Sequence, residues 1–440
     1  MIVLSLQSGT SADGIDVAVV DIEPVAGSTS SETGTGAPSL RLTPMYATTV
    51  DWEPALRARI LSAAAGEALD AGGWTRLTTE LGRAFAEAAV RGIRESGTTP
   101  DLVVSHGQTV HHWVEDGHAR GTLQLGEPAW IAERTGVPVL SDVRMADIAA
   151  GGEGAPLMAF FDRLWLGEEA RTAGRAIATV NLGGIANVQL VGTDGRVVAF
   201  DTGPGNCLID VVVERHSAGA KGYDEGGRLA AAGRVHEGLL ATLLAHPYFA
   251  APSPKSTGRE TFDLGVVDAA VAATFDDRAW SDAADPLPVA DLVATLTELT
   301  ARSVVDALAD AAPATLICSG GGALNPVLLA RIAEHATARG IAVESSAARG
   351  LDPAFKESLM FALLGWFSLH GLPVELGAEP AEARVLGRLS PGPTPLELPA
   401  PLAGVASVTI EHRTIEHRTI EHRTIEHRTD EHRTNGGATP

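Results

Sequence analysis

The feature that most constrains the fold is a pattern of strand, glycine turn and strand that occurs twice. Apolar residues 2–6 precede a polar turn with glycines, and the alternating residues 15–19 follow it, which predicts a β-hairpin. Residues 176–182 and 186–191 repeat this arrangement in the second half of the chain. The repeat is one of architecture and not of sequence. It predicts two α/β lobes that begin in the same way.

Length and composition agree with two lobes that each have a core. The chain has 440 residues, more than a single core usually holds, and 45% of them are apolar. The formal net charge of −22 repels polyanions, so nucleic acid is not expected as a partner. The first residues lack the features of a signal peptide, and no apolar run approaches the roughly 20 residues of a membrane span. We therefore expect a cytoplasmic protein without membrane contact, whose two cysteines, Cys207 and Cys318, are reduced.

Changes in composition predict the limits of the lobes. We expect a first lobe of residues 1–170 with 350–390 and a second lobe of residues 171–349. After these, prolines and then a repeated pentad, Ile-Glu-His-Arg-Thr, predict a disordered tail over residues 391–440. The five histidines of that tail could bind metal, but evenly spaced repeats without cysteine are weak evidence for a site. Residues 23–39, rich in Ser, Thr and Gly, are expected to form a flexible loop.

Three glycine turns follow apolar strands and could approach phosphate groups. The first is Ser8–Gly14, with two glycines and three hydroxyls, although an ordinary polar turn explains it equally well. The second contains Gly183 and Gly184. The third, Gly320–Gly322, lies between a strand and a helix, where backbone free of side chains suits a purine or a phosphate. A P-loop is excluded, because its glycine-lysine motif does not follow any of the strands. Such turns at strand ends in two similar halves are the layout of the actin-like ATPases, which include sugar kinases.

Asp201 is the best candidate for a catalytic side chain. It follows the apolar residues 197–200 and precedes Thr-Gly-Pro-Gly-Asn, a rigid turn that leads into a helix. A carboxylate held at the end of a strand is placed to take a proton from a nucleophile. The alternative is an aspartate that caps the turn or the following helix.

Polar and basic side chains near other strand ends could bind a sugar or a phosphate. His106, Gln108 and Thr109 follow a strand, and a metal site made with neighbouring histidines is not favoured, since no companion cysteine is present. Arg144 precedes a glycine-rich turn and could hold a carboxylate through two hydrogen bonds, although a structural salt bridge is as consistent. For the basic pair in Pro254–Glu260, Lys255 and Arg259, the spacing favours a solvated loop over a phosphate contact.

Seven segments together resemble the anhydro-N-acetylmuramic acid kinases. They occur in the order typical of that family and lie within residues 1–390, and the combination of SGTS-DGID with FD-GPGN is specific to it. The segments are Ser8–Asp16, Ser105–Thr109, Gly151–Leu157, Asn181–Asn187, Phe200–Asn206, Pro254–Glu260 and Ser319–Asn325.

The resemblance implies a two-lobed actin-like ATPase (ribonuclease H-like) fold with a cleft between the lobes, and a reaction in two parts. Asp201 matches the general base of the family, which activates water to attack the anomeric carbon of 1,6-anhydro-N-acetylmuramic acid. As the anhydro bridge opens, O6 takes the γ-phosphoryl group of ATP. The products are N-acetylmuramic acid 6-phosphate and ADP, and the pathway served is the recycling of peptidoglycan. The resemblance further suggests a homodimer.

The same resemblance assigns the binding residues. Helices at 155–166 and 356–369 would connect the lobes. The residues expected at ATP, with Mg²⁺, are Gly9, Thr10, Ser11, Ala12, Asp13, Gly14, Ile15, Asp16, Gly183, Gly184, Gly320, Gly321 and Gly322. The residues expected near the sugar are His106, Gln108, Thr109, Arg144, Gly154 and Glu357.

The sequence leaves two other functions open, and it departs from the family pattern at several positions. The chain could be an actin-like phosphotransferase that acts on an ordinary sugar hydroxyl, or an ATP-binding scaffold; the scaffold is disfavoured because Asp201 and its turn are intact. Gln7 stands where the family usually has Met, and Ala12 where it has Leu. Glu153 stands where Gln is usual, and it would repel the lactyl carboxylate of the sugar if it lay beside it.

Overall fold

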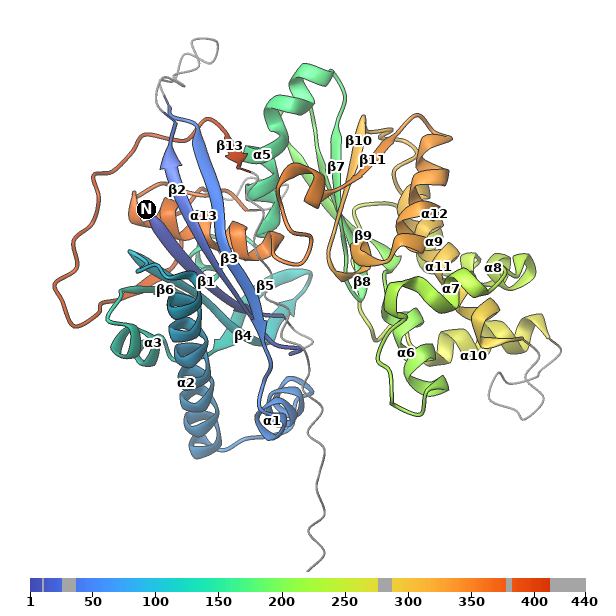
Figure 1. Ribbon diagram of the computed structural model, residues 1–440, viewed down its shortest axis with the longest axis horizontal. Helices are drawn as coiled ribbons and strands as arrows, with labels where there is room; N and C mark the ends of the chain where they lie inside the picture. Colours follow the sequence, from blue (N-terminus) through green and yellow to red (C-terminus); the bar gives the residue numbers. More distant parts are fainter. Residues whose placement is uncertain (10–11, 26–36, 276–286, 377–381, 412–440) are drawn as a thin grey trace, which may run out of the picture.

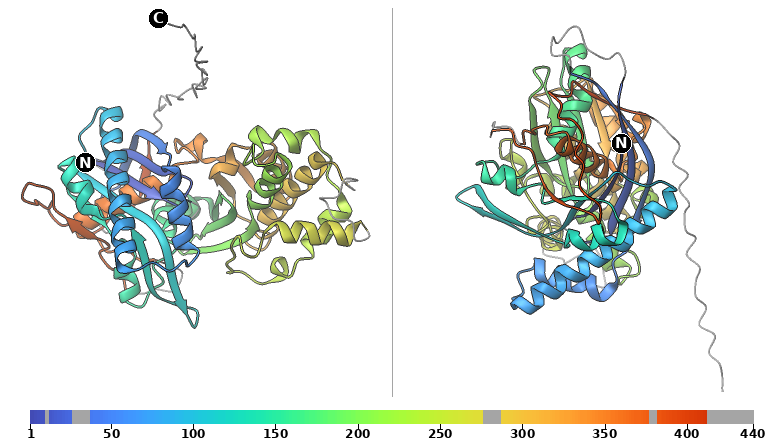
Figure 2. Two further views of the ribbon diagram at one scale, coloured as in Figure 1. Left: turned by 90° about the horizontal axis from the view of Figure 1, so that it is seen from below. Right: turned by 90° about the vertical axis from the view of Figure 1, so that its left-hand side faces the viewer.

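The computed structural model describes residues 1–9, 12–25, 37–275, 287–376 and 382–411, which form two lobes, each built around one β-sheet (Figure 1). The lobes lie side by side, as the view from below shows (Figure 2). Thr10, Ser11 and most of the predicted loop at 23–39 lie outside the described residues, as do residues 412–440 of the predicted tail. None of the helices within the described ranges combines the length and the apolar character that a membrane span requires.

The first sheet runs in the order β12-β6-β4-β1-β2-β3-β13, with β5 paired to β4. Its strands are β1 (Ile2–Ser8), β2 (Ile15–Pro24), β3 (Leu40–Val50), β4 (Leu102–Glu115), β5 (His118–Leu125), β6 (Val139–Ser141), β12 (Arg388–Ser390) and β13 (Val408–Ile410). β1 pairs antiparallel with β2 and parallel with β4. The predicted hairpin at the amino terminus is therefore confirmed, with the first glycine turn at its tip.

The second sheet repeats the central part of the first. Its strands are β7 (Ile177–Leu182), β8 (Ile185–Val191), β9 (Val197–Pro204), β10 (Thr315–Ser319) and β11 (Ala342–Ser345). The order β9-β8-β7-β10-β11 matches β3-β2-β1-β4-β6, and β7 again pairs antiparallel with the next strand and parallel with β10. This duplication confirms the predicted two-lobed, actin-like α/β fold.

Helices cover the faces of both sheets. Those of the first lobe are α1 (Pro54–Ala64), α2 (Ala71–Ser96), α3 (Pro128–Thr135), α4 (Met145–Ala149) and α13 (Lys356–Leu369). The connector helix and the helices beside the second sheet are α5 (Met158–Ala173), α6 (Cys207–His216), α7 (Arg228–Ala232), α8 (Glu237–Leu244), α9 (Pro247–Ala250), α10 (Leu264–Thr274), α11 (Val289–Asp306) and α12 (Pro326–Thr337). Short 3₁₀ turns are η1 (Glu225–Gly227), η2 (Gly321–Leu324) and η3 (Ser346–Arg349).

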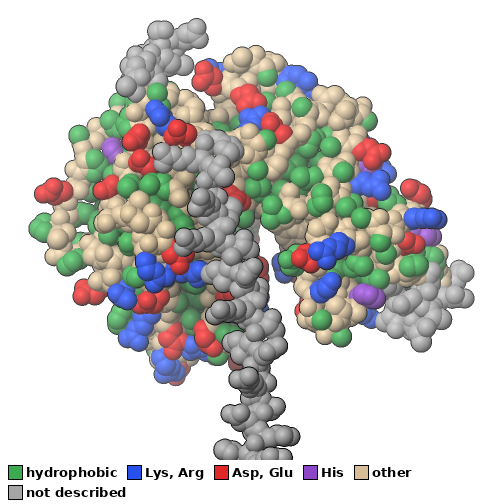
Figure 3. Space-filling view, in the orientation of Figure 1, with side chains coloured by type: hydrophobic (Ala, Val, Ile, Leu, Met, Phe, Trp, Pro, Cys, Tyr) green, Lys and Arg blue, Asp and Glu red, His purple; other side chains and the backbone are tan. Residues whose placement is uncertain are grey.

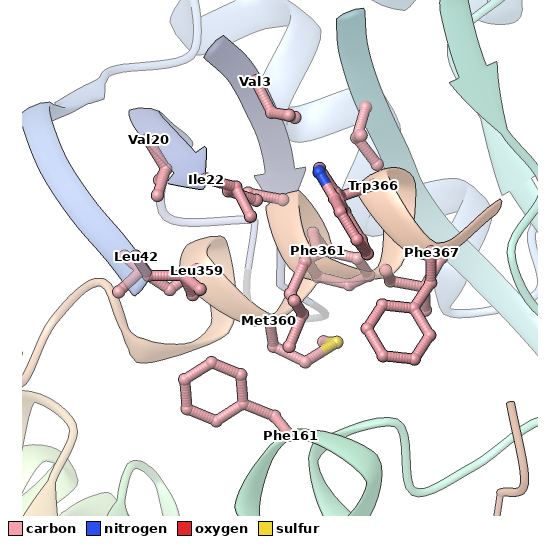
Figure 4. Close-up of a cluster of buried hydrophobic side chains, with 14 of the residues drawn as sticks. Val3, Val20, Ile22, Leu42, Phe161, Leu359, Met360, Phe361, Trp366 and Phe367 are labelled. Atoms are coloured by element: carbon pink, nitrogen blue, oxygen red, sulfur yellow. The ribbon is translucent and has the colours of Figure 1, made fainter. Parts of the chain in front are cut away.

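Alternation along β1 divides the core of the first lobe into two layers. Val3 faces α13, whereas Leu4 and Leu6 face α2 on the other side of the sheet. On the α13 side, Trp366 and Phe361 pack among apolar residues of β1 and β2, and Phe161 of α5 closes the cluster (Figure 4). The first lobe and the connector α5 thus share one apolar core.

The two helices predicted as connectors are α5 and α13. α13 coincides with the predicted range, whereas α5 begins at Met158, after Pro156, and not at residue 155. They are joined by Lys356 and Asp162, whose side chains are 6% and 0% exposed and whose Nζ and Oδ2 lie 2.8 Å apart. A buried ion pair therefore lies where the chain passes between the lobes.

The prediction of a disordered tail is wrong for its first part. β13 pairs in parallel with β3, Val408 is 2% exposed, and Thr43 donates a hydrogen bond of 2.9 Å to Glu411. The physical reason is that the edge of β3 offers unpaired backbone groups, which a short apolar segment can satisfy even after many prolines. The division into residues 1–170 with 350–390 and residues 171–349 stays a proposal.

Gly365 of α13 lies against β4 and provides a test of this packing. A Cβ atom there would lie 2.2 Å from Val104 Cγ2, so Gly365→Ala should destabilise the fold by about 1–3 kcal/mol despite its higher helix propensity. The matched control is Gly167→Ala in α5, where no atom lies within 4 Å of the added Cβ. Thermal unfolding should show a lower Tm for the first variant only. Equal Tm values would contradict the close approach of helix and sheet.

Candidate active site

A cavity of about 640 Å³ lies between the lobes, and the surface is hollowed there in the space-filling view (Figure 3). Both lobes and both connectors contribute to its wall. Among the predicted site residues, those that line it are Gly9, Asp13, Gly14, Asp16, Arg144, Gly183, Gly320, Gly321 and Glu357. The cavity therefore brings together glycine turns from two lobes with charged side chains predicted for the sugar and the phosphates.

The first turn presents backbone and carboxylates to the cavity. Ala12 has a φ of +49° and is fully buried, as is Ile15, so these two side chains face the core and only their backbone could serve a ligand. Asp16 accepts hydrogen bonds from Thr49 Oγ1 at 2.6 Å and from Gln7 Nε2 at 3.2 Å. Burial raises the pKa of Asp16, the two hydrogen bonds oppose this, and the Asp13 carboxylate adds to the rise.

The second and third turns pack against each other through glycines. Gly320 has a φ of +82°, and a Cβ atom there would lie 2.3 Å from Asn181 Oδ1. A Cβ atom on Gly322 would lie 2.7 Å from Leu182 Cβ, whereas a Cβ atom on Gly321 would meet nothing within 4 Å. Contacts within the protein therefore require glycine at 320 and 322, whereas Gly321 faces open space in the cavity.

Asp201 lies in β9, and its side chain is held by two donors. Asn187 Nδ2 donates to Oδ1 at 2.7 Å, and the backbone N–H of Thr257 donates to Oδ2 at 2.9 Å. Asn187 itself lines the cavity. Both oxygens keep a further lone pair, so the carboxylate is oriented and still able to accept a proton. The alternative role, a cap of its own turn or of the next helix, is not observed, because the side chain accepts from Asn187 and Thr257 instead.

Tyr248 contacts Asp201, and its phenol has a raised pKa. Tyr248 donates its hydroxyl to the backbone oxygen of Asp201 at 2.8 Å. Burial and the Asp201 carboxylate raise the pKa of Tyr248 to about 12. The tyrosine thus stays protonated and fixes the backbone of the strand at the candidate base.

Arg144 and Glu357 face the same cavity from the first lobe and from α13. The guanidinium of Arg144 donates to His106 Nε2 at 3.0 Å and to the backbone oxygen of Gly154 at 2.7 Å. The Glu357 side chain is exposed to the cavity but has protein atoms densely packed around it. This desolvation raises the pKa of Glu357, the Asp16 carboxylate raises it further, and Arg144 opposes the rise. Arg144 is thus oriented by residues behind it.

Gln108 and Thr109, also predicted near the sugar, form hydrogen bonds with other protein groups. Gln108 is fully buried and donates to the backbone oxygens of Gly9 at 2.9 Å and Thr109 at 3.1 Å, so it holds the first glycine turn. Thr109 accepts a hydrogen bond from Gln124 in the neighbouring strand at 3.4 Å. His106, Gln108, Thr109 and Gly154 are not among the residues that line the cavity.

Glu153 is engaged by the β5 hairpin. Its carboxylate accepts from the backbone N–H of Ala119 at 2.7 Å and lies 3.1 Å from His118 Nδ1. These donors lower the pKa of Glu153. Glu153 is not part of the cavity wall. The condition for the expected repulsion, a position beside the lactyl carboxylate of the sugar, is therefore not met.

The loop with Lys255 and Arg259 packs beside the site. Lys255 donates to the backbone oxygen of Tyr248 at 2.8 Å, and a Cβ atom on Gly184 would lie 2.9 Å from Arg259 Nε. Asp210 of α6 has its pKa raised to about 7 by burial, which Arg259 opposes and Asp13 of the other lobe increases. Residues 254–260 are mostly exposed, in agreement with the predicted solvated loop, and the same loop supplies the Thr257 donor to Asp201.

Sequence patterns did not identify three residues of the site, Asn187, Gln189 and Lys356. All three line the cavity. A signal existed for the first two, since polar side chains at alternate positions of an otherwise apolar strand point to one face. Lys356 gave no comparable signal, because a lysine at the start of a helix is usually solvated.

The protonation state of His106 can be tested directly. Burial lowers its pKa from 6.5 to about 3, and the positive charge of Arg144 contributes. Because the unfolded histidine takes up a proton below its ordinary pKa and the folded one does not, His106 should reduce stability as the pH falls below that value. In ¹⁵N-histidine NMR spectra, His106 should stay neutral with its proton on Nδ1 from about pH 8 to about pH 5. His106→Gln assigns the signal, and an imidazolium signal in that range would refute the prediction.

Comparisons with known proteins identify the family. Residues 1–392 match the family model described as anhydro-N-acetylmuramic acid kinase. The chain is 45% identical to the anhydro-N-acetylmuramic acid kinase of Streptomyces coelicolor, over 91% of this chain and 96% of that protein. It is 43% identical to the proteins of the same name from Rhodococcus erythropolis and Xanthomonas oryzae, over 89% of this chain and 94% and 97% of those proteins. With the cavity, its glycine turns and the held carboxylate in place, this agreement over nearly the whole length of both chains shows that the protein belongs to the anhydro-N-acetylmuramic acid kinase family.

Proposed function

We propose that this protein uses ATP and water to convert 1,6-anhydro-N-acetylmuramic acid into N-acetylmuramic acid 6-phosphate and ADP, a step in the recycling of peptidoglycan. The observation that carries the proposal is Asp201, a carboxylate held by two donors, one of which, Asn187, lines the interlobe cavity. Family membership indicates the substrate, and the contacts of Asp201 support its role as the base.

The bond changes balance with one carboxylate. Asp201 takes a proton from water while the water oxygen bonds to the anomeric carbon, and the bond from that carbon to O6 breaks. O6 bonds to the γ-phosphorus of ATP as the bridging bond to ADP breaks. A second acidic group is not needed for the departing oxygen, because phosphorus takes its electron pair. The proton on Asp201 then returns to solvent.

ATP would bind across the lobes between the glycine turns. Gly9, Gly14 and Gly183 line the cavity with backbone that can donate to phosphate oxygens, and Gly321 offers open space for the nucleoside. Thr10 and Ser11 complete the proposed phosphate turn, with Ala12 and Ile15 contributing backbone only.

Mg²⁺ fits the donor set beside the first turn. Within the described ranges no group of three or more His, Cys, Asp or Glu side chains is arranged to hold a metal alone. Mg²⁺ usually needs only one or two carboxylates together with phosphate oxygens, and Asp13 and Asp16 supply two at the cavity wall. When bound with ATP, the ion would neutralise charge on the phosphates.

The sugar would lie on the Arg144 and Glu357 side of the cavity. The Arg144 guanidinium can pair with the lactyl carboxylate, since His106 and Gly154 orient it from behind. Glu357 can accept from a sugar hydroxyl. A cytoplasmic location, where ATP is available, and the homodimer suggested by the family complete the proposal.

The base is tested by Asp201→Asn. The variant should lose ADP release with the anhydro sugar by about 10²-fold or more, because the amide cannot take the proton. In H₂¹⁸O, the wild type should place one labelled oxygen at C1 of the product. Asp194→Asn, a change of the same kind in the exposed turn before β9, should leave the rate unchanged. Full activity of Asp201→Asn, or label-free C1, would rule out the mechanism.

The nucleotide position is tested by Gly321→Val. Because a Cβ atom added at this exposed position meets no protein atom within 4 Å, the Tm should be unchanged, while KM for ATP should rise by roughly tenfold or more through lost binding. KM for the sugar should stay the same. An unchanged KM for ATP would place the nucleoside elsewhere.

A further inference from the structure

A row of polar side chains crosses the second sheet and ends at the candidate base. It begins on the connector helices and passes through β7 and β8 to β9. Its members, in spatial order, are Asp162, Lys356, Thr179, Gln189, Asn187 and Asp201. The first four are buried, so water competes little for their hydrogen bonds.

The row starts with an ammonium group. Lys356 Nζ donates to Asp162 Oδ2 at 2.8 Å and to Thr179 Oγ1 at 3.0 Å. Thr179 Oγ1 lies 2.6 Å from Asp162 Oδ2 and 3.0 Å from Gln189 Oε1. Two acceptors therefore surround a hydroxyl that has one hydrogen to give.

Two amides complete the row. Gln189 Nε2 donates to Asn187 Oδ1, and Asn187 Nδ2 donates to Asp201 Oδ1 at 2.7 Å. Each amide thus accepts on one side and donates on the other. The hydrogen bonds from Gln189 to Asn187 and from Asn187 to Asp201 run toward Asp201. Lys356 also donates to Asp162, and Thr179 lies closer to Asp162 than to Gln189.

That direction is required by the chemistry of Asp201. An ionised base only accepts, so Asn187 has to turn its nitrogen toward Asp201 and its oxygen toward Gln189. Gln189 must then offer its nitrogen to Asn187 and its oxygen to Thr179. The final requirement is that Thr179 donates its hydrogen to Gln189 and not to Asp162.

Lys356 meets this requirement. Because its ammonium donates to the Asp162 carboxylate, that carboxylate has less need of the Thr179 hydrogen. Because it also donates to Thr179 Oγ1, the hydroxyl accepts on one side and keeps its hydrogen for Gln189. If Thr179 gave its hydrogen to Asp162, both amides could turn over, and the oxygen of Asn187 would then face Asp201 and repel it.

We propose that Thr179, Gln189 and Asn187 are positioning residues for the reaction, and that the Lys356–Asp162 pair sets the direction of their hydrogen bonds so that Asp201 is held ready to take a proton. The inference rests on the function proposed above, in which Asp201 is the base. Thr179 is fully buried and outside the cavity wall, so its effect is on kcat through the placement of Asp201, whereas Asn187 and Gln189 also line the cavity.

Thr179 allows a test with a matched pair of variants. Thr179→Val keeps the shape and suits a strand, but it removes the hydroxyl; Thr179→Ser keeps the hydroxyl. We expect kcat of Thr179→Val to fall by about tenfold or more with KM for ATP and for the sugar within about twofold, and Thr179→Ser to recover most of the rate. Thr315→Val in β10, paired with Ile177 of β7, controls for the exchange itself.

The outcomes separate this inference from the proposed function. Asp201→Asn is measured in the same assay: if it stays active, the assignment of the base fails. If it is inactive while Thr179→Val matches the wild type, or while Thr179→Ser is as impaired as Thr179→Val, the positioning row is wrong and the base stands. Should Thr179→Val unfold, as circular dichroism would show, Gln189→Met must give the same loss of kcat with the fold intact, and a normal kcat overturns the inference.

Discussion

The buried pair of Lys356 and Asp162 is the interaction on which the joining of the two lobes depends. Taking an ammonium and a carboxylate out of water is costly, and such a pair persists only when further hydrogen bonds satisfy both groups. Thr179 of β7 supplies one of them by accepting from Lys356 Nζ. The pair thus ties α13 and α5 to the first strand of the second sheet, so the connectors and the sheet that carries Asp201 cannot be placed independently of each other.

Much of the site could be predicted from local pattern. The glycine turns and Asp201 follow short apolar strands, and in a duplicated α/β fold these strand ends meet at one cleft. The partners of Lys356 could not be predicted in this way, since Asp162 is 194 residues away and lies on another helix. β13 was missed for the same reason, because the strand edge that orders it is formed by residues 40–42. Long-range pairing of this kind leaves no local sequence pattern.

Departures from the family pattern have local physical explanations. Gln7 uses its amide to hold Asp16, which a methionine at that position could not do. Glu153 is satisfied by the backbone of the β5 hairpin and lies outside the cavity wall. The side chains of Gln7 and Glu153 thus bond to groups other than the candidate base.

β13 has a consequence for the ends of the protein. The strand pairs in parallel with residues 40–42, at one end of the free edge of β3, beyond the residues that match the family model. Unpaired backbone groups at a strand edge are a template for pairing with another chain. A protein shortened to the family boundary would therefore expose the backbone of residues 40–42 at this edge to such pairing.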